Sequence, residues 1–100
     1  MLDQKRVFET LKAHGVSYFT GVPDSYLNGF CNYALARCGD RNVITANEGN
    51  AVALAAGHYL ATKETPLVYM QNSGEGNTVN PLASLADKDV YAIPMILLIG

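Results

Sequence analysis

The sequence predicts an α/β domain with three layers, α/β/α, around a mainly parallel sheet. Short apolar runs rich in β-branched and aromatic residues alternate with longer stretches of helical periodicity, which is typical of βαβ units. The chain has 100 residues, 49% of them hydrophobic, which is enough for one domain with a buried core and too few for two. We therefore assign residues 1–100 to one domain, with strands expected at residues 17–20, 42–45, 67–70 and 93–99.

Two amphipathic helices are expected before the second of these strands. The first has an apolar face around Phe8 and ends near Gly15. The second has apolar residues at steps of three and four and is expected to end at Gly39, a good position for a left-handed residue. Because Cys31 and Cys38 both fall on its apolar stripe, we expect buried free thiols rather than a metal or redox pair.

The third helical stretch, residues 51–57, is small and apolar on every side. Such a pattern predicts a helix that is buried all round. Its cover comes either from its own sheet and neighbouring helices or from another subunit, and the segment alone favours neither.

The last apolar run, residues 95–100, reads as a buried parallel strand with no element after it. We therefore expect a truncated domain, either a fragment of a longer chain or one subunit of a split enzyme.

Composition excludes several kinds of partner. The formal net charge is -2 and 16% of residues are charged, without a basic patch, so nucleic acid is not expected as a partner. The first residues lack the layout of a signal peptide, and no apolar stretch approaches the roughly 20 residues that span a bilayer. We expect a cytoplasmic protein without a membrane segment.

Three polar loops follow the first three predicted strands, at residues 21–25, 46–50 and 72–77. Ligands of open parallel sheets bind beyond the carboxyl ends of the strands, so these loops form the candidate site. The second loop carries Glu48 at the start of a helix. Alone, such a glutamate is best explained as a complement to the helix dipole, and the two companion loops make it a candidate catalytic acid.

The companion loops are ambiguous one at a time. Asp24 or Ser25, after the stiff Pro23, either caps the next helix or belongs to a site. Gly74 and Gly76 form a short GxG, a weak signal for a phosphate loop, and neither a dinucleotide fingerprint nor a Walker lysine is present. The two histidines allow no metal cluster.

Taken together, the loops resemble the pyrimidine-binding domain of thiamin diphosphate-dependent decarboxylases, and within that family most closely the phosphonopyruvate decarboxylases. The matching stretches are TGVPDS at residues 20–25, NEGNA at residues 47–51 and QNSGEGNTVNPL at residues 71–82. Because the resemblance runs across almost the whole chain in order and spacing, it is far more specific than any single motif. It identifies residues 1–100 as an incomplete N-terminal pyrimidine-binding domain of that fold type.

The resemblance implies a role for each loop. Glu48 hydrogen-bonds the pyrimidine N1′ of thiamin diphosphate, so that the cofactor's own amino group can act as a base. Pro23, Gly74, Gly76 and Asn77 are implied to lie against the cofactor.

Two further residues are implied to face the substrate, a small 2-oxo acid. Asp24 and Ser25 are expected on that side of the cofactor, where they orient the substrate carboxylate or relay a proton. For 3-phosphonopyruvate the products are phosphonoacetaldehyde and carbon dioxide, in phosphonate biosynthesis.

The family's diphosphate and Mg²⁺ site, a Gly-Asp-Gly motif in a second domain, is absent from this sequence, because the pair Gly39 and Asp40 is followed by Arg41. The resemblance therefore implies a diphosphate-binding domain on a second subunit, a homo-oligomer when full length, and a fragment that is inactive alone. Two alternatives stay open. One is the α subunit of a sulfopyruvate decarboxylase, and the other is a flavodoxin-like binding module without catalysis.

Overall fold

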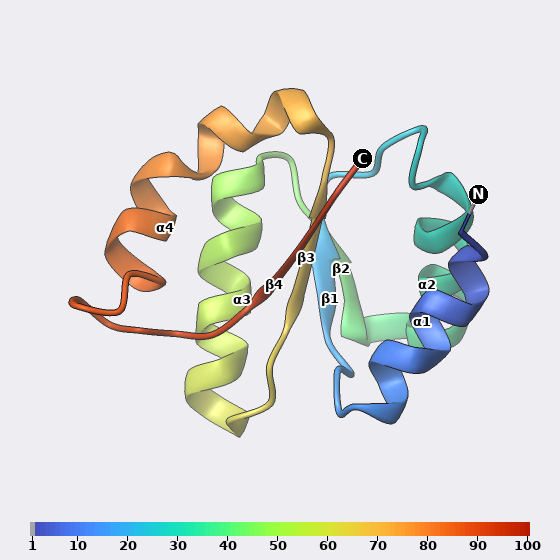
Figure 1. Ribbon diagram of the computed structural model, residues 1–100, viewed down its shortest axis with the longest axis horizontal. Coiled ribbons are helices and arrows are strands. Elements are labelled where there is room, and N and C mark those ends of the chain that lie inside the picture. Colours follow the sequence, from blue (N-terminus) through green and yellow to red (C-terminus); the bar gives the residue numbers. More distant parts are fainter. Residues whose placement is uncertain (1) are drawn as a thin grey trace.

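The computed structural model describes residues 2–100 and has a four-stranded sheet between two layers of helices (Figure 1). The helices are α1 (Gln4–Ala13), α2 (Asn28–Cys38), α3 (Glu48–Thr62) and α4 (Val79–Leu85). The strands are β1 (Phe19–Gly21), β2 (Asn42–Ile44), β3 (Leu67–Met70) and β4 (Ile96–Ile99). Two 3₁₀ helices, η1 (Gly39–Arg41) and η2 (Asn72–Thr78), complete the chain.

All four strands are parallel and lie in the order β2-β1-β3-β4. Helices α1 and α2 cover one face of the sheet, and α3 and α4 cover the other (Figure 1). This confirms the predicted three-layer α/β/α architecture. Because β2 and β3 flank β1 on opposite sides, the connecting helix α3 must cross over β1, and it contacts both β1 and β3.

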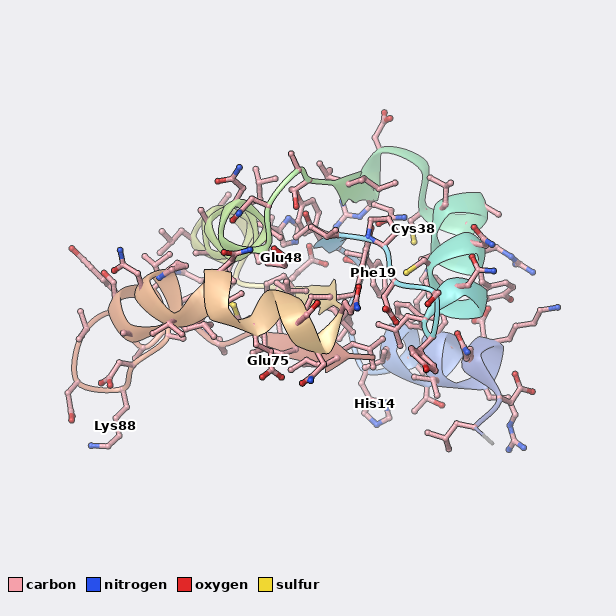
Figure 2. The ribbon with its side chains drawn as sticks, turned by 90° about the horizontal axis from the view of Figure 1, so that it is seen from above. His14, Phe19, Cys38, Glu48, Glu75 and Lys88 are labelled. Atoms are coloured by element: carbon pink, nitrogen blue, oxygen red, sulfur yellow. The ribbon has the colours of Figure 1, made fainter. Side chains whose placement is uncertain are left out.

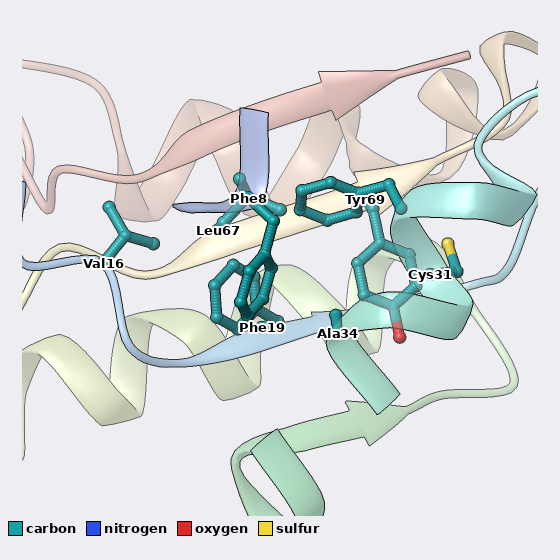
Figure 3. Close-up of a cluster of buried hydrophobic side chains, with 8 residues drawn as sticks. Phe8, Val16, Phe19, Cys31, Ala34, Leu67 and Tyr69 are labelled. Carbon is teal, nitrogen blue, oxygen red and sulfur yellow. The ribbon is translucent and has the colours of Figure 1, made fainter. Parts of the chain in front are cut away.

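Strand β3 supplies the centre of the core on both faces. Its Leu67 and Tyr69 join a cluster with Phe8 and Phe19 (Figure 3). The ring centroids of Phe8 and Phe19 lie 5.1 Å apart. On the other face, Val68 packs against the small residues of α3. Burial on both faces explains why this strand reads in the sequence as a continuous apolar run.

The end of α2 agrees with the sequence prediction. Gly39 follows it with a φ of 54°, in the left-handed region. Cys31 is buried and Cys38 is half-buried, and both thiols are free, so the expectation of two buried thiols holds fully only for Cys31. Burial raises the pKa of both thiols.

Within residues 2–100 the third helix is not covered on every side, and its cover by another subunit stays a prediction. Leu54 is 42% exposed and Leu60 is 60% exposed. The helix buries one stripe against the sheet, and α4 lies alongside another part of its surface. The buried stripe consists of Ala51, Val52, Ala55 and Ala56.

Two elements differ from the sequence prediction in extent. Residues 72–78 form η2 and lead into α4, where the sequence indicates only a glycine-rich loop. Pro81 fits there because it lies in the first turn of α4, where a backbone N–H has no intrahelical partner to lose. Strand β4 begins at Ile96 and not at Ile93, after Pro94, which cannot donate a ladder hydrogen bond. Within residues 2–100 no helix is both long and apolar enough to cross a membrane.

Candidate active site

The three candidate loops lie at one edge of the sheet, where the strands end. Backbone hydrogen bonds fasten this edge: the Thr45 amide donates to the Gly21 carbonyl at 2.9 Å, and the Asn72 amide donates to the Gly100 carbonyl at 3.0 Å. Because α3 crosses over β1 toward β3, its first residue, Glu48, is carried toward η2, which follows β3. Figure 2 looks down on this edge and shows Glu48 between α3 and the η2–α4 segment, with Glu75 on the outer side of that segment.

The start of α3 is defined by Asn47. Its backbone is extended, and its side-chain Oδ1 accepts a hydrogen bond from the Gly49 amide at 2.7 Å. This is the usual arrangement of an N-cap residue. As a result Glu48 is the first helical residue, and the positive end of the helix dipole lies beside its carboxylate.

The Glu48 carboxylate is held by the neighbouring loop. Asn77 Nδ2 donates to Glu48 Oε2 at 2.8 Å. On the other side of the carboxylate lies Gly74, where an added Cβ would overlap with Glu48 Oε1. A Cβ at Gly49 would lie 2.7 Å from the Asn77 carbonyl oxygen, so glycine is needed at that position as well. The structure thus brings together three of the residues that the sequence predicts, Glu48, Gly74 and Asn77.

The loop after β1 lies on the side of α2, away from this cluster of three. Asp24 is only 5% exposed, and its Oδ2 accepts from the Tyr26 amide at 2.9 Å and the Leu27 amide at 3.1 Å. Its Oδ1 is buried without a hydrogen-bond partner among residues 2–100. Pro23 and Ser25 are exposed at the rim of the same loop.

Asp24 therefore organises the turn before α2 but does not cap the helix, because the N-cap residue of α2 is Leu27 and no side chain makes a cap hydrogen bond there. It also keeps one carboxylate oxygen unpaired. A buried carboxylate oxygen without a donor is costly, so this atom needs a partner from outside the described residues.

Sequence reasoning missed two contributors to the site. The Asn47 cap could have been recognised, because asparagine directly before an acidic helix start is a common N-cap signal. Gly49 had no such signal, because its importance comes from the approach of the Asn77 carbonyl, a contact between distant parts of the chain. Gly76 is exposed, and a Cβ there would have no atom within 4 Å, so its place in the site differs from that of Gly74.

The geometry allows proton exchange at Glu48. Oε2 is engaged by Asn77, which leaves Oε1 without a hydrogen-bond partner among the described residues and able to meet a ring nitrogen of a ligand. This fits the pyrimidine end of thiamin diphosphate. Within residues 2–100 no group of three or more His, Cys, Asp or Glu side chains could hold a metal ion.

The fold and the loop residues define a parallel α/β domain whose candidate site lies at the carboxyl ends of its strands. The chain belongs to the thiamine pyrophosphate enzymes, because the family model for their N-terminal TPP binding domain matches residues 4–100. The membership confirms the predicted family.

Relatives with known names fall into two groups. The chain is 32% identical over 94 residues to the sulfopyruvate decarboxylase subunit alpha of Methanococcus maripaludis, covering 94% of this chain and 54% of the relative. It is 36% identical over 85 residues to the phosphonopyruvate decarboxylase of Streptomyces hygroscopicus, covering 85% of this chain and 21% of the relative. The chain thus spans about half the length of the first relative and about a fifth of the second.

The solved structures agree on the fold. The benzoylformate decarboxylase of Polynucleobacter necessarius superposes with a TM-score of 0.78 at 22% identity. The superposition covers 97% of this chain and 18% of the decarboxylase. At this level of identity the likeness supports the fold and not a substrate.

Proposed function

We propose that this chain is the pyrimidine-binding part of a thiamin diphosphate-dependent 2-oxo acid decarboxylase, with Glu48 as the residue that exchanges a proton with the cofactor. The observation that supports the proposal most is the state of the Glu48 carboxylate. Asn77 holds one oxygen, and the other has no partner at the edge of the sheet where ligands bind. Family membership over residues 4–100 agrees with this role.

The residues of this chain would divide the work as follows. When bound, thiamin diphosphate supplies the nucleophilic carbon and the electron sink of the reaction. Glu48 would hold a proton against the pyrimidine N1′. Gly74, Gly76 and Pro23 would shape the space around the ring, and Asn77 would hold the Glu48 carboxylate beside it.

Asp24 and Ser25 would act on the substrate side. In support of this role, Asp24 Oδ1 is buried without a partner, so a ligand group that donates a hydrogen bond would satisfy it. The exposed hydroxyl of Ser25, next in the chain, could orient the substrate carboxylate. Asp24 and Ser25 lie in the loop after β1, away from Glu48. They would therefore act together with Glu48 only through a cofactor that reaches from one loop to the other.

The rest of the enzyme would come from outside these residues. We propose that a diphosphate-binding domain of a second subunit supplies the site for the diphosphate and Mg²⁺, so that the working enzyme is an oligomer. Such an enzyme would act on a small soluble acid in the cytoplasm.

For the substrate we propose 3-phosphonopyruvate, which would be converted into phosphonoacetaldehyde and carbon dioxide. The supporting observation is the higher identity to the phosphonopyruvate decarboxylase, 36% against 32%. The second candidate is 3-sulfopyruvate, and it is supported by the longer match to the sulfopyruvate decarboxylase α subunit. Both are three-carbon 2-oxo acids with an anionic group at C3. The three loops contain no lysine or arginine, so we propose that the cations that bind this group lie outside them.

The test measures carbon dioxide release by the full-length protein with its diphosphate-binding partner, thiamin diphosphate and Mg²⁺, on each substrate. We expect Glu48→Gln to lower turnover about a hundredfold or more, the contribution of a proton-transfer group. Glu75→Gln, an exposed matched change on the outer side of η2, is expected to leave turnover intact. Near-normal turnover of Glu48→Gln would refute the role of Glu48, and a preference for the sulfonate would refute the substrate.

A further inference from the structure

We propose that Asn77 is a positioning residue, which fixes the Glu48 carboxylate through its side-chain N–H and does not act by contacting the cofactor. The inference rests on the proposed function, and it replaces the sequence-based expectation that Asn77 binds the cofactor directly.

The direction of the contact follows from chemistry. The Asn77 Nδ2 atom lies 2.8 Å from Glu48 Oε2. An oxygen of Glu48 that carries no proton can only accept a hydrogen bond, so the amide must turn its N–H group toward Oε2. Hydrogen bonds to a charged acceptor are stronger than those between neutral groups.

The backbone of Asn77 is fixed against the start of α3. The closest approach is at Gly49, where the Asn77 carbonyl oxygen lies too close for any side chain. Gly49 is itself held by the Asn47 side chain through its amide. The donor and the acceptor of the Asn77–Glu48 bond are therefore attached to two backbone segments that touch each other.

Gly74 completes the support from the opposite side. It leaves room for the carboxylate where any other residue would overlap with Oε1. A free glutamate side chain has many rotamers and loses them at an entropic cost when it is ordered. With a donor on Oε2 and a glycine beside Oε1, Glu48 is ordered before a ligand arrives, which is the supporting arrangement that a precise catalytic group requires.

Two substitutions separate the donor from the shape of Asn77. Asn77→Asp has the same shape but presents a second acceptor to Glu48, and Asn77→Ala removes the side chain. We expect both to lower kcat about 10- to 100-fold, the effect of losing a hydrogen bond to a charged group, with KM for substrate and Kd for thiamin diphosphate unchanged. Asn80→Ala, an exposed asparagine three residues later, is the matched control and should keep the parental kcat.

A double-variant cycle in the full-length enzyme asks through which group Asn77 acts. In a Glu48→Ala background, Asn77→Ala should cause no further loss of kcat, because the partner it positions is gone. Losses that multiply would show an independent contact with cofactor or substrate and would overturn the inference. Parental kcat in Asn77→Asp would overturn it as well, since shape alone would then suffice.

A structural readout needs no cofactor. In a crystal structure of full-length Asn77→Ala without thiamin diphosphate, we expect the Glu48 carboxylate to be displaced or to occupy several rotamers. A carboxylate that stays in place would overturn the inference while leaving the proposed function standing. If Glu48→Ala itself keeps normal turnover, the proposed function fails, and the inference fails with it.

Discussion

The carboxylate of Glu48 lies so close to Gly74 that a Cβ on Gly74 would overlap with its Oε1 atom. The backbone of Gly74 is outside the left-handed region, so the contact with Glu48, and not the backbone conformation, is what requires glycine there. The two residues come from the start of α3 and from η2, which the crossover of α3 brings together.

This contact makes Gly74→Ala a direct test of the site geometry. The added methyl group must push the Glu48 side chain or the backbone of η2 away. We expect a loss of about 1–3 kcal/mol in the free energy of unfolding, as for other overpacked positions, together with a fall in turnover. Urea unfolding and a decarboxylation assay on the full-length protein measure the two effects.

Gly76→Ala is the matched control for stability. A Cβ at Gly76 has no atom within 4 Å, and its φ is not in the left-handed region. We expect its unfolding midpoint to be equal to or slightly above that of the parent, because alanine restricts the unfolded chain more than glycine does. Equal destabilisation by both substitutions would show that the segment tolerates no side chain, and the specific contact with Glu48 would lose its support.

Asp24 offers a way to separate a role in the turn before α2 from a role in catalysis. Asparagine at this position keeps an oxygen that can accept from the Tyr26 and Leu27 amides, so Asp24→Asn should unfold like the parent. Asp24→Ala loses the acceptor of these turn amides and should cost about 1 kcal/mol, as for a lost intramolecular hydrogen bond. If Asp24 exchanges a proton with the substrate, both variants lose turnover by about a hundredfold or more. Parental turnover in Asp24→Asn would leave Asp24 with its role in the turn only.

Asn47 is expected to act on stability through its cap of α3. Asn47→Ala removes the acceptor for the Gly49 amide and should lower the free energy of unfolding by about 1 kcal/mol. Asn47→Asp preserves the acceptor and should be close to the parent in stability. Asn50→Ala, an exposed change in the first turn of the same helix, serves as the control. A full loss in Asn47→Asp would show that the side-chain amide, and not its oxygen, is what matters.

The sequence was sufficient to predict the layers of the fold and to single out candidate site residues, but not their contacts. The alternation of apolar runs and helices predicts the parallel sheet, and the motifs single out Glu48, Gly74 and Asn77. The hydrogen bond between Glu48 and Asn77 depends on the strand order, which places η2 beside a helix start 29 residues away in the chain, and no local pattern contains that information.

The same limit explains the errors. The stretch 51–57 of α3 is small and apolar on every side, so its pattern does not indicate which side the sheet covers. The exposure of Leu54 and Leu60 was therefore not predicted. Residues 72–78 have amide and glycine residues without an apolar period, and the helical turns of η2 form against α3. In both cases tertiary packing decided what the local sequence leaves open.

The buried Tyr69 gives a prediction for alkaline pH. Its hydroxyl donates to Asn42 Oδ1 at 2.8 Å, and burial raises the pKa of Tyr69 from 10.0 to about 12. Because the folded state holds this proton more tightly than the unfolded state, the resulting stability is fully present below pH 10 and is lost as the pH rises toward about 12. Deprotonation inside the core would break the hydrogen bond and leave a buried phenolate.

Tyr69→Phe should therefore be less stable than the parent near neutral pH, by about 1–3 kcal/mol, because Asn42 Oδ1 loses its donor inside the core. Between pH 10 and about 12 the parent loses the stability linked to the Tyr69 proton, and the phenylalanine variant has no such proton to lose, so the gap between them should narrow. Urea unfolding at a series of pH values measures the gap, with Tyr91→Phe, at a tyrosine that is 68% exposed, as the control. A gap that stays constant through this range would mean that Tyr69 ionises equally well in the folded and unfolded chain, which its burial in the core makes unfavourable.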